Sequence, residues 1–195
     1  MARKEIEKEK VLQIIEDYKK KKKIKLYTPY KYFKGITSKK SIILRMEEML
    51  KNRHEKDPAK IKFTTDDKKK EIKKSKYHVA FEKFYKISSH VSLKKKEEVT
   101  GVPLSILQKV RARGIAAWKT GHRLNTNPNQ WGNARVSSFL TLGCTAFSSD
   151  ADLIHQVNKI KNKKIKLFFS QKPSCPKSQI DKYKSRSNFP SFLFK

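Results

Sequence analysis

Apolar side chains recur every three or four residues through the first half of the chain, with charged residues between them. This is the spacing of one face of an amphipathic helix, and Val11, Ile15 and their neighbours follow it. Alternation of apolar and polar residues, which is typical of a half-buried strand, does not extend beyond a few positions. The pattern therefore predicts helices at about residues 3–22, 38–53 and 65–86.

The clearest helical pattern runs from Thr100 to Trp118, where Pro103 suits the first helical turn. Two shorter helices are indicated by their capping residues. In "NPNQW", Asn127 is a suitable N-cap, and in "SSDADL", Ser149 is an N-cap with Asp152 three residues later. The second half of the chain is thus predicted to be helical as far as about residue 157.

Charge is distributed unevenly along the 195 residues. Residues 1–100 hold a net charge of +16, residues 101–158 only +4, and residues 159–195 +10. Since the least charged block is the one best able to pack, the core is predicted there. The expected fold is mainly α, a small helical domain with extended basic N- and C-terminal arms. Its predicted parts are a basic helix and arm at 1–37, a basic helical segment at 38–91, a compact core at 92–158 and an extended tail at 159–195.

A net charge of +30 opposes compaction by self-repulsion and calls for a polyanionic partner. No stretch approaches the roughly 18 apolar residues of a membrane-spanning helix, and the charged N-terminus does not resemble a secretory signal. Cys144 and Cys175 are far apart and fit no zinc or redox spacing, which suits a protein made in a reducing compartment. Cys144 is expected to be a small buried thiol.

The segment "KKKEEVTGVPLSILQKVRARG" has the outline of a helix-turn-helix, with Gly101 in the turn. Glu97 stands where a small residue usually permits close crossing of the two helices, which favours a plain helical hairpin. In either case the second helix and the turn after it present cations. The residues predicted to bind nucleic acid or a capsid partner are Lys109, Arg111, Arg113, Lys119, His122 and Arg123.

The two tryptophans allow two interpretations. Trp118 and Trp131 could form a stacking surface beside phosphate-binding arginines, because indoles stack on bases. They could equally be core residues, with Arg135 bonded to helix C-terminal carbonyls. Since a small core needs its largest side chains, the structural interpretation is favoured for Trp118, Trp131, Gly132 and Arg135.

Nothing in the sequence indicates catalysis. Asp150 and Asp152 lack a third ligand at metal spacing and are explained as helix-start residues. The five histidines form no metal-binding motif, and six glycines form no phosphate-cradling loop. We therefore expect no catalytic residue, no metal, no cofactor, no small-molecule substrate and no enzymatic activity.

The stretches "RARGIAAWKTGHR", "QWGNARVSSFLTLG" and "DADL" resemble a short uncharacterised domain of large double-stranded DNA viruses of algae and protists and of tailed phages. Its pattern is R-G-x-A-A-x-x-[ST]-G-x-R-P, then W-G-x-A-R-[LV]-x-S, then T-G-G-K and D-x-x-L. The resemblance spans about residues 26–157 and is most specific in its last third. Leu124 replaces the proline, and Leu142 and Cys144 replace a glycine and the lysine of T-G-G-K. The matching residues are Arg113, Gly114, Ala116, Ala117, Gly121, Arg123, Trp131, Gly132, Ala134, Arg135, Ser138, Thr141, Gly143 and Leu153.

The resemblance implies a virion-associated protein. We expect a structural component of a large DNA virus, a minor capsid protein that bridges or cements capsomers on the inner face of the shell. Its partners would be the major capsid protein, other minor capsid proteins, and packaged DNA or an inner membrane surface. It would be made in the host cytoplasm or nucleus and would not be secreted. The alternative is a non-specific, helix-turn-helix-like nucleic-acid-binding protein.

Overall fold

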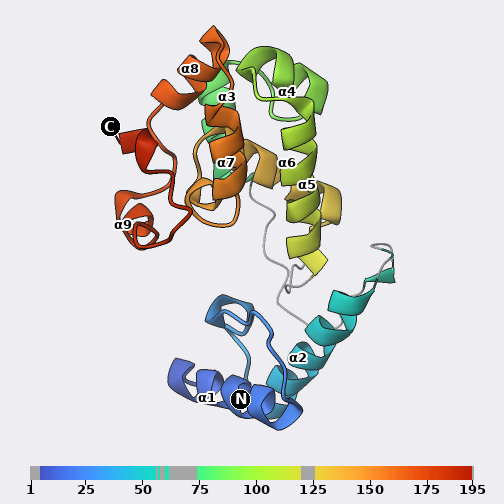
Figure 1. Ribbon diagram of the computed structural model, residues 1–195. Helices are drawn as coiled ribbons and strands as arrows, with labels where there is room; N and C mark the ends of the chain where they lie inside the picture. Colours follow the sequence, from blue (N-terminus) through green and yellow to red (C-terminus); the bar gives the residue numbers. More distant parts are fainter. Residues whose placement is uncertain (1–4, 56, 58–59, 62–73, 120–125, 195) are drawn as a thin grey trace. The chain divides into compact units, whose positions relative to one another are not determined.

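The computed structural model describes residues 5–55, 57, 60–61, 74–119 and 126–194. Within them the chain forms nine α-helices and short 3-10 turns, with no strand (Figure 1). The prediction of a mainly α fold is confirmed. The chain divides into two compact units, Met1–Ile72 with Ala116–Pro128 and Lys73–Ile115 with Asn129–Lys195. A single compact core was predicted at residues 92–158, whereas each unit has its own core.

The first unit is built on α1 (Lys8–Lys22) and α2 (Lys39–His54), with a 3-10 turn, η1 (Tyr30–Tyr32), between them. The apolar face of α1 packs against that of α2 through residues such as Val11 and Met46, which are fully buried. The basic helix expected within residues 1–37 corresponds to α1, but this segment is packed into a core and does not form the extended arm that was also predicted. Burial of its apolar face against α2 stabilises it as part of a small helical core.

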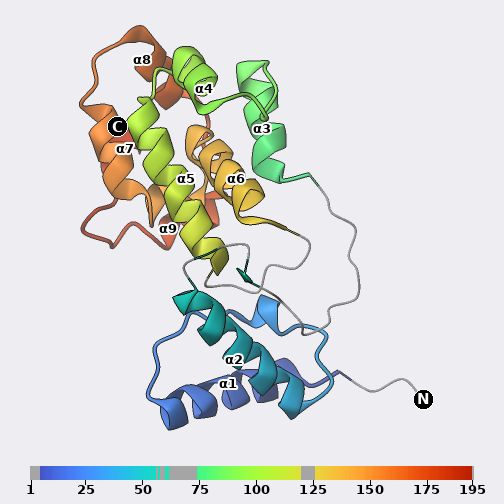
Figure 2. The same ribbon diagram turned by 90° about the vertical axis from the view of Figure 1, so that its right-hand side faces the viewer.

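The second unit contains the remaining helices (Figure 2), except that α5 from Ala116 onward and Pro128 of α6 belong to the first unit. Its core is formed by side chains from helices that are far apart in sequence, among them Phe81, Val110, Phe139, Ile154 and Phe168. All five are fully buried. The elements are α3 (Lys76–Tyr85), α4 (Leu93–Thr100), α5 (Leu104–Lys119), α6 (Pro128–Leu140), η3 (Cys144–Phe147), α7 (Ala151–Asn158), α8 (Lys163–Ser170), α9 (Lys177–Asp181) and η4 (Ser191–Phe194).

The C-terminal segment is also not the extended tail that was predicted. Asn162 caps α8, its side-chain oxygen accepting a hydrogen bond of 2.8 Å from the backbone N–H of Ile165. Ile165 and Phe168 of α8 and Ile180 of α9 are buried in the core of the second unit. The apolar face of α8 is short and lies among lysines, yet it is enough to dock the segment.

The predicted helices elsewhere correspond to observed ones. The helices expected at 3–22, 38–53 and 100–118 are α1, α2 and α5, with ends shifted by up to five residues. The one expected at 65–86 is α3, which begins at Lys76, and residues 62–73 lie outside the described part of the chain. Among the helices described here, none has the length and apolar character needed to cross a membrane.

Candidate functional site

The α5 helix and its contacts with α6 contain most of the residues that the sequence singled out. Lys109 is exposed on α5. Arg111 instead points along α6, where its Nε donates to the Asn133 side-chain oxygen at 3.2 Å and its Nη2 to that of Asn129 at 2.8 Å. One of these two cations is thus open to a partner, while the other is engaged inside the second unit.

Two motif glycines bring α5 and α6 into direct contact. A Cβ atom added to Gly114 would lie 2.7 Å from the Cα of Gly132, closer than real Cβ contacts allow. A Cβ atom added to Gly132 would lie 3.0 Å from Cγ and 3.1 Å from the carbonyl oxygen of Arg111. Both glycines are therefore explained by close helix packing, in which backbone touches backbone.

An ion cluster next to this crossing ties α7 to α5 and α6. The carboxylate of Asp150, which is fully buried, accepts hydrogen bonds from Nε and Nη2 of Arg135 at 2.9 and 2.8 Å. Nη1 of Arg113 lies 3.3 Å from Asp150 Oδ1. Arg113 also forms a bidentate ion pair with Asp152, in which Nη1 donates to Oδ1 and Nη2 to Oδ2, each at 2.7 Å. Two arginines are thus matched by two carboxylates.

The electrostatics of the cluster follow from these contacts. The hydrogen bond from Arg113 holds the pKa of Asp152 below its ordinary value, and the same bond raises the pKa of Arg113. Both arginines also reach Ser149, since Arg113 donates to its carbonyl at 2.8 Å and Arg135 to its hydroxyl at 2.7 Å. With their donors directed at these acceptors, the two guanidinium groups stabilise the fold.

The start of α7 differs from the sequence prediction. Ser149 was expected to be the N-cap, but the N-cap position is Asp150, and its side chain makes no capping hydrogen bond. Its carboxylate is turned to the arginines instead. A charged partner offers stronger hydrogen bonds than a single backbone N–H, which explains why the arginines prevail.

Of the remaining predicted site residues, Trp118 and Lys119 belong to the first unit and Trp131 to the second. Trp118 is buried, and its Nε1 donates to the carbonyl and hydroxyl oxygens of Thr126 at 3.0 and 3.2 Å. Nζ of Lys119 donates to the Glu55 carbonyl at 3.3 Å. Trp131, on α6, is partly buried. Residues 120–125, and with them His122 and Arg123, lie outside the described part.

The helix-turn-helix outline corresponds to α4 and α5, joined through Gly101 in the left-handed conformation at φ 75°. Glu97 has a structural role that the sequence did not reveal. Its Oε1 accepts a hydrogen bond of 2.8 Å from the backbone N–H of Leu104, the first residue of α5. The carboxylate therefore caps the second helix, and the position usually held by a small residue is occupied by a capping group.

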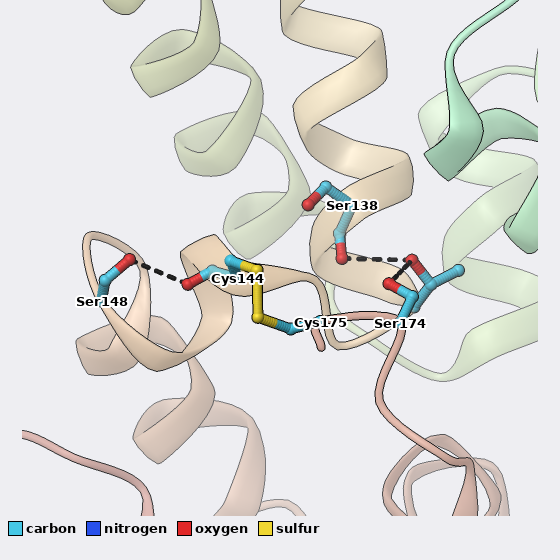
Figure 3. Close-up of a disulfide and its surroundings, with 6 residues drawn as sticks. Ser138, Cys144, Ser148, Ser174 and Cys175 are labelled. Atoms are coloured by element: carbon cyan, nitrogen blue, oxygen red, sulfur yellow. Dashed lines mark hydrogen bonds between the residues drawn. A yellow bond between two sulfur atoms is a disulfide. The ribbon is translucent and has the colours of Figure 1, made fainter. Parts of the chain in front are cut away.

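Cys144 and Cys175 form a disulfide (Figure 3). The expectation that Cys144 is a buried free thiol was therefore wrong. The bridge joins η3 to the segment between α8 and α9, across 31 residues of sequence. Backbone hydrogen bonds run beside it from Ser174 to Thr141 at 2.9 Å and from Cys175 to Leu142 at 3.3 Å.

The turn that holds this disulfide is tightly constrained. Leu142 has a left-handed backbone, φ 48°, at the position where the resembling pattern has glycine. A Cβ atom on Gly143 would lie 2.1 Å from the hydroxyl of Ser138. The T-G-G-K stretch of the pattern thus corresponds here to a structural turn, with Cys144 of the bridge in place of its lysine.

A second polar cluster lies at the end of α3. The Glu82 carboxylate accepts hydrogen bonds from Lys74 at 2.6 Å and from the backbone N–H and hydroxyl of Ser89 at 3.0 and 2.8 Å. These bonds, that from Lys74 above all, lower the pKa of Glu82 to about 2. Nearby, the buried Lys96 donates to the Ser89 carbonyl at 2.7 Å. The cluster fixes the loop between α3 and α4.

In the residues that the structure describes, no three His, Cys, Asp or Glu side chains gather as a metal-binding group.

A family model, described as a family of unknown function and designated DUF5824, matches residues 29–172. The chain belongs to the DUF5824 family. No curated protein and no solved structure matches it. The DUF5824 match includes the α5–α6 crossing, the ion cluster and Cys144, and ends before Cys175.

Proposed function

We propose that this DUF5824 protein is a structural component of a large DNA virus particle, a minor capsid protein that bridges or cements capsomers on the inner face of the shell. The observation on which the proposal rests is the Cys144–Cys175 disulfide. Disulfides are rare in proteins that stay in a reducing cytosol and persist in secreted proteins and virions. A particle component leaves the cell, whereas a soluble nucleic-acid-binding protein that acts inside it does not.

The use of the motif residues supports the same proposal. The motif glycines, Gly114 and Gly132, are packed in the contact between α5 and α6. The motif arginines, Arg113 and Arg135, donate hydrogen bonds to carboxylates within the second unit. The motif therefore specifies a fold. An enzyme would be expected to hold such polar groups ready for a substrate. We therefore propose no enzymatic activity and no cofactor.

The partners follow from the charge. With 48 Lys and Arg against 18 Asp and Glu, the protein requires acidic surfaces around it. Inside a particle these would be the major capsid protein, other minor capsid proteins, packaged DNA or an inner membrane surface.

The alternative, a non-specific nucleic-acid-binding protein, is favoured by the hairpin of α4 and α5 around the left-handed Gly101. Of the cations that its second helix would offer, however, Arg111 and Arg113 are bound within the second unit. Lys109 is exposed and open to a phosphate. The virion proposal is therefore preferred.

The test is to purify particles of the virus that encodes the chain, treat them with nuclease and high salt, and measure the ratio of the chain to the major capsid protein. The proposal predicts a fixed ratio that survives both treatments. Release of the chain by nuclease, or its absence from particles, would contradict the proposal and favour the intracellular alternative.

A further inference from the structure

The strongest concentration of uncompensated charge in the second unit lies on and before α8. Residues 153–180 contain seven lysines and no acidic residue. Lys161, Lys163 and Lys166 are exposed and have no ion-pair partner within the described chain. This segment was predicted to be an extended tail, and no binding residue was predicted in it. Because α8 is docked on the core, they are held on a surface.

The α4 helix lies beside α8 at the same end of the second unit (Figures 1 and 2). The Lys164 side chain bridges them by donating to the backbone carbonyl of Glu98. Lys94 and Lys95 of α4 are exposed, and Lys95 pairs with the Glu98 carboxylate at 3.0 Å. The pKa of Glu98 is lowered chiefly by Lys95, with smaller effects of Lys94 and Lys164. Lysines of both helices therefore act on the same carboxylate.

These residues define the α4–α8 lysine patch, namely Lys94, Lys95, Lys161, Lys163, Lys164 and Lys166. Glu98 is the acidic side chain placed among them. One carboxylate against six ammonium groups leaves the patch strongly positive, and it needs an anion with several charges at separate points.

The side-chain types favour the phosphates of a nucleic acid duplex. Lysine binds phosphate as a flexible point charge, and it is depleted in protein–protein interfaces. Phe168 of α8 is buried and Phe169 packs edge-on against it at 4.8 Å, so neither offers a free face on which an unpaired base could stack. Leu167, 54% exposed, is the one large apolar side chain that α8 leaves open, too little for insertion into lipid.

We propose that the α4–α8 lysine patch binds the phosphate backbone of double-stranded nucleic acid without reading its sequence. This inference rests on the proposed function, which names packaged DNA among the partners, and deepens it by assigning the nucleic-acid contact to particular lysines. It also moves the nucleic-acid contact from the predicted α5 cations to α4 and α8.

The test uses the full chain and short duplexes of unrelated sequence. The triple variant Lys161→Gln, Lys163→Gln, Lys166→Gln is compared with wild type and with a matched variant. The matched variant, Lys20→Gln, Lys21→Gln, Lys22→Gln, removes the same charge from exposed lysines of α1. Affinity is measured between about 50 and 200 mM salt, where each lost phosphate contact lowers the slope of log affinity against log salt by about 0.9. Thermal unfolding of each variant checks that the fold is kept.

The proposal predicts that the α8 variant lowers the slope by about 2 to 3 for every duplex, while the α1 variant leaves it nearly unchanged. Equal losses in the two variants would overturn it, because binding would then follow net charge alone. An unchanged slope in the α8 variant would also overturn it. So would a loss of binding to phosphatidylserine vesicles with duplex binding retained, since the patch would then be a lipid surface. The particle test above is independent of all these outcomes.

Discussion

Replacing Asp150 with alanine should destabilise the second unit by about 3 kcal/mol. The substitution removes both carboxylate oxygens that accept hydrogen bonds from Arg135, whose side chain is 12% exposed, and leaves that guanidinium largely buried without its counter-ion. Removing one partner of a buried pair costs about 3 to 5 kcal/mol, and the lower end applies because water reaches Arg113. For a unit of this size the loss corresponds to a fall in Tm of about 10 °C.

Asp152 provides the matched control, because it lies two residues away and also pairs with Arg113. Both members of this pair are exposed, at 36% for Arg113 and 47% for Asp152. Exposed pairs contribute less than about 1 kcal/mol, so Asp152→Ala should lower Tm by only a few degrees. Scanning calorimetry of the full chain compares the two variants directly.

A double-mutant cycle with Arg135→Ala measures whether Asp150 acts through this arginine. The coupling energy between the two positions should exceed about 1 kcal/mol. Two results would refute the reasoning: equal destabilisation by Asp150→Ala and Asp152→Ala, or a Tm for Asp150→Ala within 2 °C of wild type, a margin of roughly 0.5 kcal/mol. Either result would mean that burial of the carboxylate does not determine how much it contributes to the free energy of unfolding.

Three further predictions concern stability. Cys144→Ser, which leaves Cys175 unpaired, should cost about 3 to 4 kcal/mol in chemical denaturation, from the entropy of closing a 31-residue loop; a loss below 1 kcal/mol would contradict this. Gly114→Ala should lower the free energy of unfolding by about 1 kcal/mol or more, because the added methyl group would push against Gly132. Helix propensity alone predicts the opposite, a gain in stability of about 1 kcal/mol. A rise in the calorimetric Tm would therefore disprove the close crossing. The folded pKa of Glu82 is about 2 against an ordinary 4.5, so its stabilisation is present above pH 4.5 and lost as pH falls toward 2. The Tm difference between wild type and Glu82→Gln should therefore shrink over this range, and a constant difference would argue against the hydrogen-bonded carboxylate.

Local patterns in the sequence were sufficient to predict the longer helices. The α1, α2 and α5 helices have apolar positions every three or four residues over at least 15 residues, and tertiary packing only shifts their ends. The α8 helix was missed because it has only eight residues and five of the eight residues in the segment 159–166 are lysines. Its two buried residues, Ile165 and Phe168, are too few to show a period.

The contacts of the candidate site depend on pairings that no local pattern encodes. Arg113 and Asp150 are 37 residues apart, and Cys144 and Cys175 are 31 apart. A helix-start signature explained Asp150 equally well, which concealed its role as a counter-ion. The resemblance includes both Gly114 and Gly132, but the contact between them becomes evident only when α5 and α6 are placed against each other.

The oxidation state of Cys144 and Cys175 in purified particles tests the proposed function most directly, because the proposal rests on their disulfide. Particles are opened in denaturant with a thiol-alkylating reagent, and peptides are mapped by mass spectrometry without reduction. The account predicts a peptide pair linked through Cys144 and Cys175, present at a fixed ratio to the major capsid protein. Alkylated, unlinked cysteines in chain recovered from particles, or no chain at all, would contradict it.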